Sequence, residues 1–151
     1  MARTPTWIKK LGGHAGELYV CAELSKRGIP NALLPENFSD EDVLVGKKDG
    51  NELGFVQVKS CHPDRSTSFI LRDAHEAWVK APDNQIVALV WLGSPAKNES
   101  PRFWLSTKAE LGQACRNHAA HGTDNWERRF GVDTLPSEWE ENWKIFERFR
   151  P

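Results

Sequence analysis

The chain has 151 residues, of which 39% are hydrophobic and 27% are charged, and its 20 lysine and arginine side chains nearly balance 21 aspartate and glutamate side chains. This length suits one domain, which buries enough apolar surface to fold without disulfide bonds. Residues 1–80 carry 11 basic and 11 acidic side chains, and residues 81–151 carry 9 and 10, so neither half is a basic nucleic-acid arm or an acidic tail. The composition excludes fibrous and disordered proteins.

The cysteines and the apolar segments indicate where the protein resides. Cys21, Cys61 and Cys115 are odd in number and far apart, which argues against a disulfide framework and for a reducing compartment. The longest apolar run, Ile86 to Leu92, is far shorter than the roughly 20 residues of a membrane helix. Residues 1–16 lack the apolar centre of a signal peptide. We therefore expect a cytoplasmic protein without membrane contact.

The first predicted element is a helix from Leu11 to Gly28, where the glycine ends it. Its wide apolar arc comprises Leu11, Ala15, Leu18, Val20, Cys21, Ala22 and Leu24. Glu17 lies at the centre of this arc, whereas Glu23 lies on the polar side with Lys26 and Arg27. A carboxylate that faces a core needs a partner. An edge position, where the carboxylate reaches solvent or a buried cation, explains Glu17 equally well.

The following elements are shorter and alternate between strands and helices. An extended segment at 29–34 precedes a hairpin, because Asp49-Gly50 separates two β-rich runs. The remaining strands are predicted at 69–71, 85–92 and 102–105, and the helices at 73–80, 107–118 and 137–149. The last helix opens on a capping box, Ser137-x-x-Glu140. This order predicts a mixed central β-sheet flanked by helices, an α/β (α+β) fold, in a single domain with a core at 11–106 and a helical extension at 107–151.

The hairpin gathers three polar side chains on one face of the sheet. If Asp49-Gly50 is the centre of the turn, Asp42 lies opposite Gln57, and Lys59 lies on the same face two residues along. Oxygen ligands beside an inward glutamate suit Mg²⁺, and an ammonium group suits the attack of water on a phosphodiester. A solvated sheet face, with Asp42 and Lys59 as an ordinary ion pair, fits the spacing as well.

These segments resemble the PD-(D/E)XK nuclease superfamily, which has the restriction-endonuclease-like fold. The resemblance rests on Gly16-Glu17 in an amphipathic helix, Asp42-Val-Leu-Val, and Val56-Gln57-Val58-Lys59-Ser60; it is good over residues 16–60 and extends through the strands to Leu105. It implies that Asp42 and Gln57 bind Mg²⁺, with Mn²⁺ as a substitute, that Lys59 is the catalytic lysine, and that Glu17 is an additional metal ligand.

Two positions depart from the pattern of the superfamily. Glu41 precedes Asp42 where many relatives have proline, and Gln57 replaces an acidic residue, which leaves the site with one negative charge fewer. Branches that resemble junction resolvases and some phage or mobile-element nucleases carry the same Q-x-K variant.

Other residues have a weaker connection with function. His14, Ser60 and Arg65 are candidates for contact with nucleic acid, although packing or a polar loop explains them as well. Trp139, Trp143 and Phe146 form a stripe that is typical of a core or of a homodimer contact. Stacking of bases on Trp126 beside Arg128-Arg129 is a further hypothesis.

The sequence as a whole favours a divalent-metal-dependent nuclease that hydrolyses phosphodiester bonds, with DNA as the expected partner. The choice between endonuclease and exonuclease stays open. Because the net charge is only −1, we expect binding to depend on a local basic rim, a metal ion or a partner. One alternative is a catalytically weakened module of the same fold, with a binding or immunity-type role. Another is an interaction protein whose Trp-rich end docks a partner.

Overall fold

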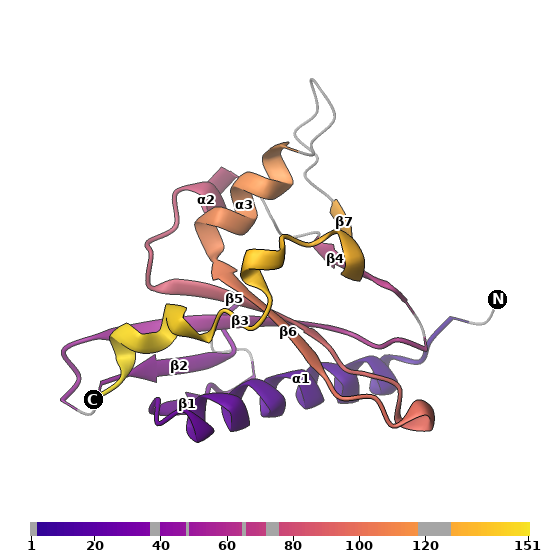
Figure 1. Ribbon diagram of the computed structural model, residues 1–151, viewed down its shortest axis with the longest axis horizontal. Coiled ribbons are helices and arrows are strands. Elements are labelled where there is room, and N and C mark those ends of the chain that lie inside the picture. The colour runs from indigo at the N-terminus through magenta and orange to yellow at the C-terminus, as the bar shows by residue number, and fades with distance from the viewer. Residues whose placement is uncertain (1–2, 37–39, 48, 65, 72–75, 118–127) are drawn as a thin grey trace.

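The computed structural model describes residues 3–36, 40–47, 49–64, 66–71, 76–117 and 128–151 (Figure 1). Five strands form one sheet in the order β1-β2-β3-β5-β6. Their bounds are Asn31–Leu33 (β1), Val43–Gly46 (β2), Leu53–Cys61 (β3), Gln85–Trp91 (β5) and Arg102–Thr107 (β6). β3 and β5 are parallel, and the other neighbours are antiparallel. The predicted mixed central sheet is therefore confirmed.

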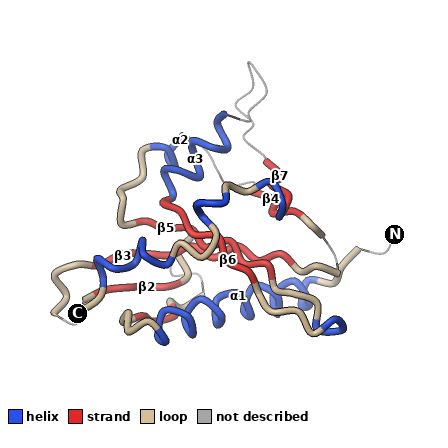
Figure 2. Tube along the Cα trace, in the orientation of Figure 1, coloured by secondary structure: helices blue, strands red, loops and turns tan. Residues whose placement is uncertain are grey.

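Helices cover both faces of this sheet, as the tube view makes clear (Figure 2). α1 (Thr6–Lys26) lies along one face, and α2 (Glu76–Val79) and α3 (Lys108–Asn117) lie on the other. β4 (Ser68–Leu71) pairs with β7 (Arg128–Gly131) in a separate two-stranded ribbon. Short 3₁₀ segments occur at Pro95–Lys97 (η1) and Val132–Thr134 (η2). Within the part of the chain that the structure describes, no helix is both long and apolar enough to cross a membrane.

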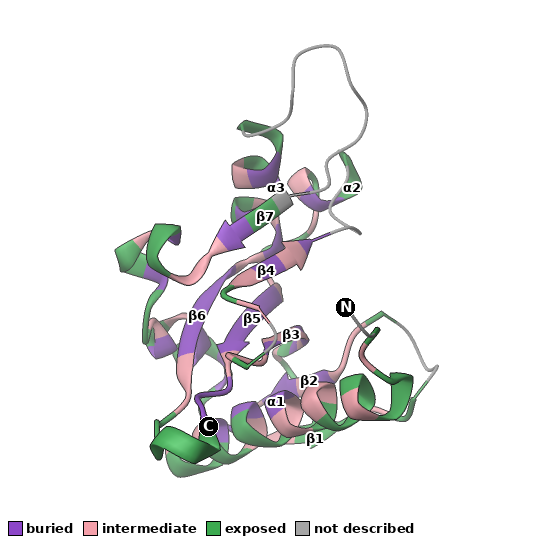
Figure 3. Ribbon diagram, turned by 90° about the vertical axis from the view of Figure 1, so that its right-hand side faces the viewer, coloured by how far each residue is buried: buried purple, intermediate pink, exposed green. Residues whose placement is uncertain are grey.

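Strand β5 separates two hydrophobic cores. Ile86, Ala88 and Val90 pack with residues of α1, and the alternating residues Val87 and Leu89 pack with residues of α3. A strand that is buried on both faces reads as an unbroken apolar run, which explains why the sequence predicted it well. The strands are the most buried layer, between helices with exposed outer faces (Figure 3).

The hairpin has the predicted register. Leu44 lies opposite Phe55 in the β2–β3 pair. The Lys47 N–H donates to the Glu52 carbonyl at 2.9 Å, and Gly50 has a φ of 74°, a left-handed conformation that glycine adopts without strain. The Asp-Gly turn therefore fixes which side chains of β3 share a face with those of β2.

Helix α1 differs from the prediction at its start and on its apolar face. It begins at Thr6 rather than Leu11, and it ends as expected just before Gly28, whose φ is 74°. The buried residues are Gly16, Val20 and Leu24. Leu11 and Leu18, which were expected to face the core, are 58% and 46% exposed. The buried face is narrow because the sheet covers only one side of the helix.

The C-terminal segment forms two 3₁₀ segments, Ser137–Trp139 (η3) and Trp143–Phe149 (η4), instead of the single predicted helix. The predicted capping box does not form, because the Glu140 carboxylate accepts a hydrogen bond from Arg102 at 2.9 Å. Glu141 has a φ of 55°, so the backbone turns away from a helical path at this point.

The aromatic stripe of this segment belongs to the core: Trp139, Trp143 and Phe146 are 6%, 5% and 0% exposed. The prediction that these side chains pack in the core is confirmed, and the hypothesis that they form a docking surface for a partner is wrong. Phe149 lies against Gly54 of β3, where an added Cβ would come within 2.5 Å of its ring. Arg148 donates to Glu52 at 2.7 Å. The C-terminal segment thus packs against the β2–β3 hairpin and pairs with it. Trp126 lies outside the described residues.

Helix α1 lies tightly against β3 at Gly16. A Cβ at this position would collide with Ser60 Oγ, and it would lie 3.2 Å from Ser60 Cβ and 3.4 Å from Val58 Cγ1. Only glycine allows this approach, and the next residue of the helix is Glu17.

We predict that Gly16→Ala lowers the free energy of unfolding by about 1–3 kcal/mol, because the added methyl group overpacks the contact between α1 and β3. Adding Ser60→Ala should recover part of this loss, because it removes the colliding hydroxyl group. Urea unfolding of the two single variants and the double variant measures both effects. Gly13→Ala is the control: its Cβ would meet nothing within 4 Å, so it should stabilise the helix. If the changes in unfolding free energy of the two single variants simply add in the double variant, the contact between residues 16 and 60 is contradicted.

Candidate functional site

Asp42 is held at the start of β2 by the backbone of β3. Its N–H donates to the Val56 carbonyl at 2.9 Å, and its Oδ2 accepts the Val58 N–H at 2.7 Å. These two bonds fix both the backbone and the carboxylate. The half-buried side chain therefore has a defined orientation without any contribution from a ligand.

Glu17 reaches Asp42 from α1. The two carboxyl groups lie close enough to act on each other's pKa. Burial raises the pKa of Glu17 first, the negative charge of Asp42 raises it further, and the nearby His14 opposes the shift. Burial also raises the pKa of Asp42, although the Val58 N–H and the positive charge of Lys59 favour its ionised form. The pair is thus an acidic centre in which both carboxyl groups have a raised pKa.

Gln57 and Lys59 lie on β3, on the face that the hairpin register assigns to Asp42, whereas α1 with Glu17 packs on the other face of β3, against Val58 and Ser60. Gln57 is 5% exposed, opposite Val87 of β5, and its Oε1 has no hydrogen-bond partner among the described residues. Lys59 is half-buried and close enough to act on the pKa of Asp42. Glu23, in contrast, pairs with Arg27 and Lys26.

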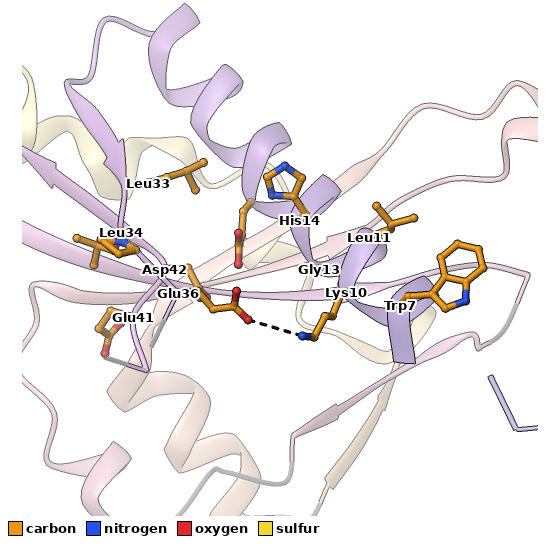
Figure 4. Close-up of a pocket in the computed structure, with 12 residues that line it drawn as sticks. Trp7, Lys10, Leu11, Gly13, His14, Leu33, Leu34, Glu36, Glu41 and Asp42 are labelled. Atoms are coloured by element: carbon orange, nitrogen blue, oxygen red, sulfur yellow. Dashed lines mark ion pairs between the residues drawn. The ribbon is translucent and has the colours of Figure 1, made fainter. Parts of the chain in front are cut away.

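A groove runs from the carboxyl pair along α1 (Figure 4). This α1 groove has a volume of about 760 Å³ and is lined by Trp7, Lys10, Leu11, Gly13, His14 and Glu17 of α1 and by Leu33, Leu34, Pro35, Glu36, Glu41 and Asp42. Lys10 and Glu36 form an ion pair of 4.0 Å across it. Trp7 and Glu17 are ten residues apart on the helix, so the groove extends about 15 Å from the carboxyl pair. Gln57 and Lys59 do not line the groove.

The candidates for nucleic-acid contact lie in different surroundings. His14 is exposed and lines the α1 groove. Ser60 is packed against Gly16, and its hydroxyl oxygen is buried. Arg65 lies outside the described residues. Contact of these residues with nucleic acid stays a prediction.

Sequence reasoning missed a buried ion pair beside the site. Lys108, at the start of α3, donates to Glu41 Oε1 at 3.0 Å, and the two side chains are 10% and 13% exposed. The Lys108 ammonium also lies 5.1 Å from the ring centroid of Trp78. Because Glu41 precedes Asp42, this pair anchors the chain on the other side of the site. The groove residue Trp7 was missed too, although its spacing from Leu11 and His14 is helical.

The sequence matches no family model and no curated protein. Among solved structures, the chain resembles that of a bacterial homing endonuclease, I-Ssp6803I, with a TM-score of 0.56. The match covers 99% of this chain and 95% of that chain at 13% sequence identity. The two proteins share a fold. At 13% identity the likeness shows the arrangement of helices and strands alone.

The donor set of the site fits a hard divalent cation. Glu17 and Asp42 supply carboxylate oxygens at the groove. Gln57, whose Oε1 has no partner among the described residues, lies opposite Val87 on the sheet face that α3 covers. Among the residues that the structure describes, no group of three or more histidine, cysteine, aspartate or glutamate side chains could hold a metal. Mg²⁺ commonly uses only one or two carboxylates and completes its shell with water and phosphate.

We predict that Asp42→Asn leaves the metal-free protein as stable as the wild type, or more stable, at neutral pH. Raised pKa values mean that the fold favours the protonated carboxyl groups. Their stabilising contribution is full below the ordinary pKa of about 4 and is lost as pH rises through the raised pKa. The variant has one such group fewer, so its unfolding midpoint should fall less between about pH 4 and pH 7. Thermal melts in chelator measure this difference.

Saturating Mn²⁺ should raise the midpoint of the wild type and do little for Asp42→Asn, since a ligand that binds only the folded state stabilises it. Asp133→Asn, an exposed position, is the control and should respond to Mn²⁺ like the wild type. Equal metal responses of the wild type and Asp42→Asn would exclude Asp42 as a ligand.

Proposed function

We propose that the protein is a divalent-metal-dependent nuclease of the PD-(D/E)XK superfamily, in its Q-x-K form, that hydrolyses phosphodiester bonds in DNA. The observation that carries the proposal is the half-buried pair Glu17–Asp42, with raised pKa values and Lys59 beside it. Carboxyl groups held in this way are costly unless a positive charge joins them. The fold shared with an endonuclease and the sequence motifs support the same proposal.

Each residue has a distinct role in this proposal. Glu17, Asp42 and Gln57 would hold Mg²⁺, which neutralises phosphate charge and lowers the pKa of water when it is bound. The Val58 N–H keeps the Asp42 carboxylate in place, which limits the reorganisation that binding requires. The Lys59 ammonium stabilises the negative charge that develops on the phosphate in the transition state.

We predict that Lys59→Ala retains metal binding and loses cleavage, with kcat lower by about 100- to 1000-fold, because it removes one group that stabilises the transition state. Asp42→Ala should lose both metal binding and cleavage. The assay offers single-stranded, duplex and branched DNA and RNA with Mg²⁺ or Mn²⁺, and calorimetry measures metal binding. Lys97→Ala, an exposed position outside the site, is the matched control. Robust cleavage by either site variant would remove that residue from the mechanism.

The second candidate function is a binding or immunity-type module of the same fold with a weakened metal site. The neutral Gln57 and the net charge of −1 favour it. Both candidates share the site but differ in turnover. Cleavage that depends on both the metal and Lys59 supports the nuclease, and nucleic-acid binding without cleavage supports the module.

We predict that Gln57→Glu binds Mn²⁺ more tightly than the wild type and is less stable without metal, by more than about 1 kcal/mol. A third acidic group near Glu17 and Asp42 adds repulsion that only a cation relieves. The shift of the thermal midpoint between chelator and Mn²⁺ should therefore be larger than in the wild type. Gln57→Ala should show a smaller shift. An unchanged shift in both variants would place Gln57 outside the metal shell.

A further inference from the structure

The α1 groove presents apolar side chains to water next to the proposed catalytic site. Trp7 is 64% exposed, Leu11 is 58% exposed, and Leu33 on the opposite wall is 39% exposed. Apolar patches of this kind on a soluble protein usually mark a binding surface. Since the same groove ends at Glu17 and Asp42, whatever occupies it lies beside the reacting phosphate.

The charges of the groove do not suit the phosphate backbone of a duplex. Lys10 is the only lysine or arginine among the described residues that line it, and it is paired with Glu36. The same lining includes four carboxyl groups, those of Glu17, Glu36, Glu41 and Asp42. Binding of duplex DNA depends on cationic side chains that replace counterions, and the groove supplies few of them.

The shape and chemistry of the groove suit nucleobases instead. Its volume of about 760 Å³ lies in the range of pockets that hold flat organic ligands. Trp7 and His14 carry rings on the same helix with Leu11 between them, and Leu33 and Leu34 add apolar surface on the opposite wall (Figure 4). Bases stack on such side chains with little regard to sequence, provided that they are unpaired.

We propose that the α1 groove binds unpaired bases of the strand that is cleaved, so that the substrate carries a single-stranded or splayed segment beside the scissile phosphate. This inference rests on the proposed nuclease function. The phosphate lies at the carboxyl pair, and the adjoining bases extend along α1 towards Trp7. Because the groove is acidic, a divalent cation is needed for the strand to enter, and binding depends only weakly on monovalent salt.

The test measures binding in the Lys59→Ala protein, which does not cleave if the proposed function holds. Fluorescence anisotropy compares a labelled oligothymidine with a blunt duplex of equal length, in Mn²⁺ and in chelator. We expect tighter binding of the oligothymidine, and only with Mn²⁺. Adding Trp7→Ala should weaken this binding by about 5- to 150-fold, which corresponds to the loss of one stacking contact, and should change duplex binding little.

Two matched variants control for general damage to the helix. Trp7→Phe keeps a ring face and should retain most of the affinity. Tyr19→Ala removes another aromatic side chain from α1 that is 40% exposed but does not line the groove, and it should bind like the Lys59→Ala parent. Trp7 is mostly exposed, so its replacement should leave the thermal midpoint unchanged.

Several results would overturn the inference. One is equal affinity for the oligothymidine with and without the Trp7→Ala substitution, and another is a preference of the Lys59→Ala parent for the blunt duplex. A third is a Trp7→Ala variant that sediments differently from its parent but binds DNA equally well, which would assign the groove to a contact between copies of the chain. Cleavage by the unsubstituted protein tests the nuclease separately. If it cleaves but Trp7 has no effect, only the groove inference fails; if Trp7-dependent binding occurs without cleavage, only the nuclease fails.

Discussion

The site depends on the close contact between α1 and β3 at Gly16. A side chain at this position would push the helix away from the strand, and the carboxyl group of Glu17 would no longer reach Asp42. The same contact places the helix so that its outer face forms one wall of the α1 groove. One missing Cβ therefore sets the positions of both the acidic centre and the surface that leads to it.

The sequence predicted the parts of the fold that local chemistry determines. The Asp-Gly turn predicted the hairpin register, and the apolar run of β5 indicated a strand that is buried on both faces. The sequence pattern gave wrong predictions where tertiary contacts determine the burial or the conformation of a segment. Leu11 and Leu18 have the periodicity of buried residues, yet nothing described covers them, and the C-terminal segment follows the shape of the sheet rather than its own helical pattern. β7, a strand of four residues, has no pattern of its own.

The site shows the same division. Glu17 was predicted because it is an acid in the middle of an apolar arc, and Asp42 and Gln57 because the hairpin register predicts that they share a face; their joint role stays a prediction. The Lys108–Glu41 pair joins residues 67 positions apart, which no periodic signal connects. It is a largely buried charge pair that the protein neutralises itself, next to the carboxyl pair of Glu17 and Asp42, whose pKa values are raised.

The contacts between the C-terminal segment and the β2–β3 hairpin have a consequence for the order of folding. The β2–β3 turn closes locally, whereas Arg148 pairs with Glu52 of the hairpin across 96 positions, and Arg150 donates to the Arg27 carbonyl at the end of α1 across 123 positions. Contacts of such separation form late, because a long loop must be closed before they are gained. We expect the nascent chain to pass through a state with a formed hairpin and an open core, in which the acidic residues are not yet assembled. The carboxyl pair of α1 and β2 would then come together only in the last step of folding.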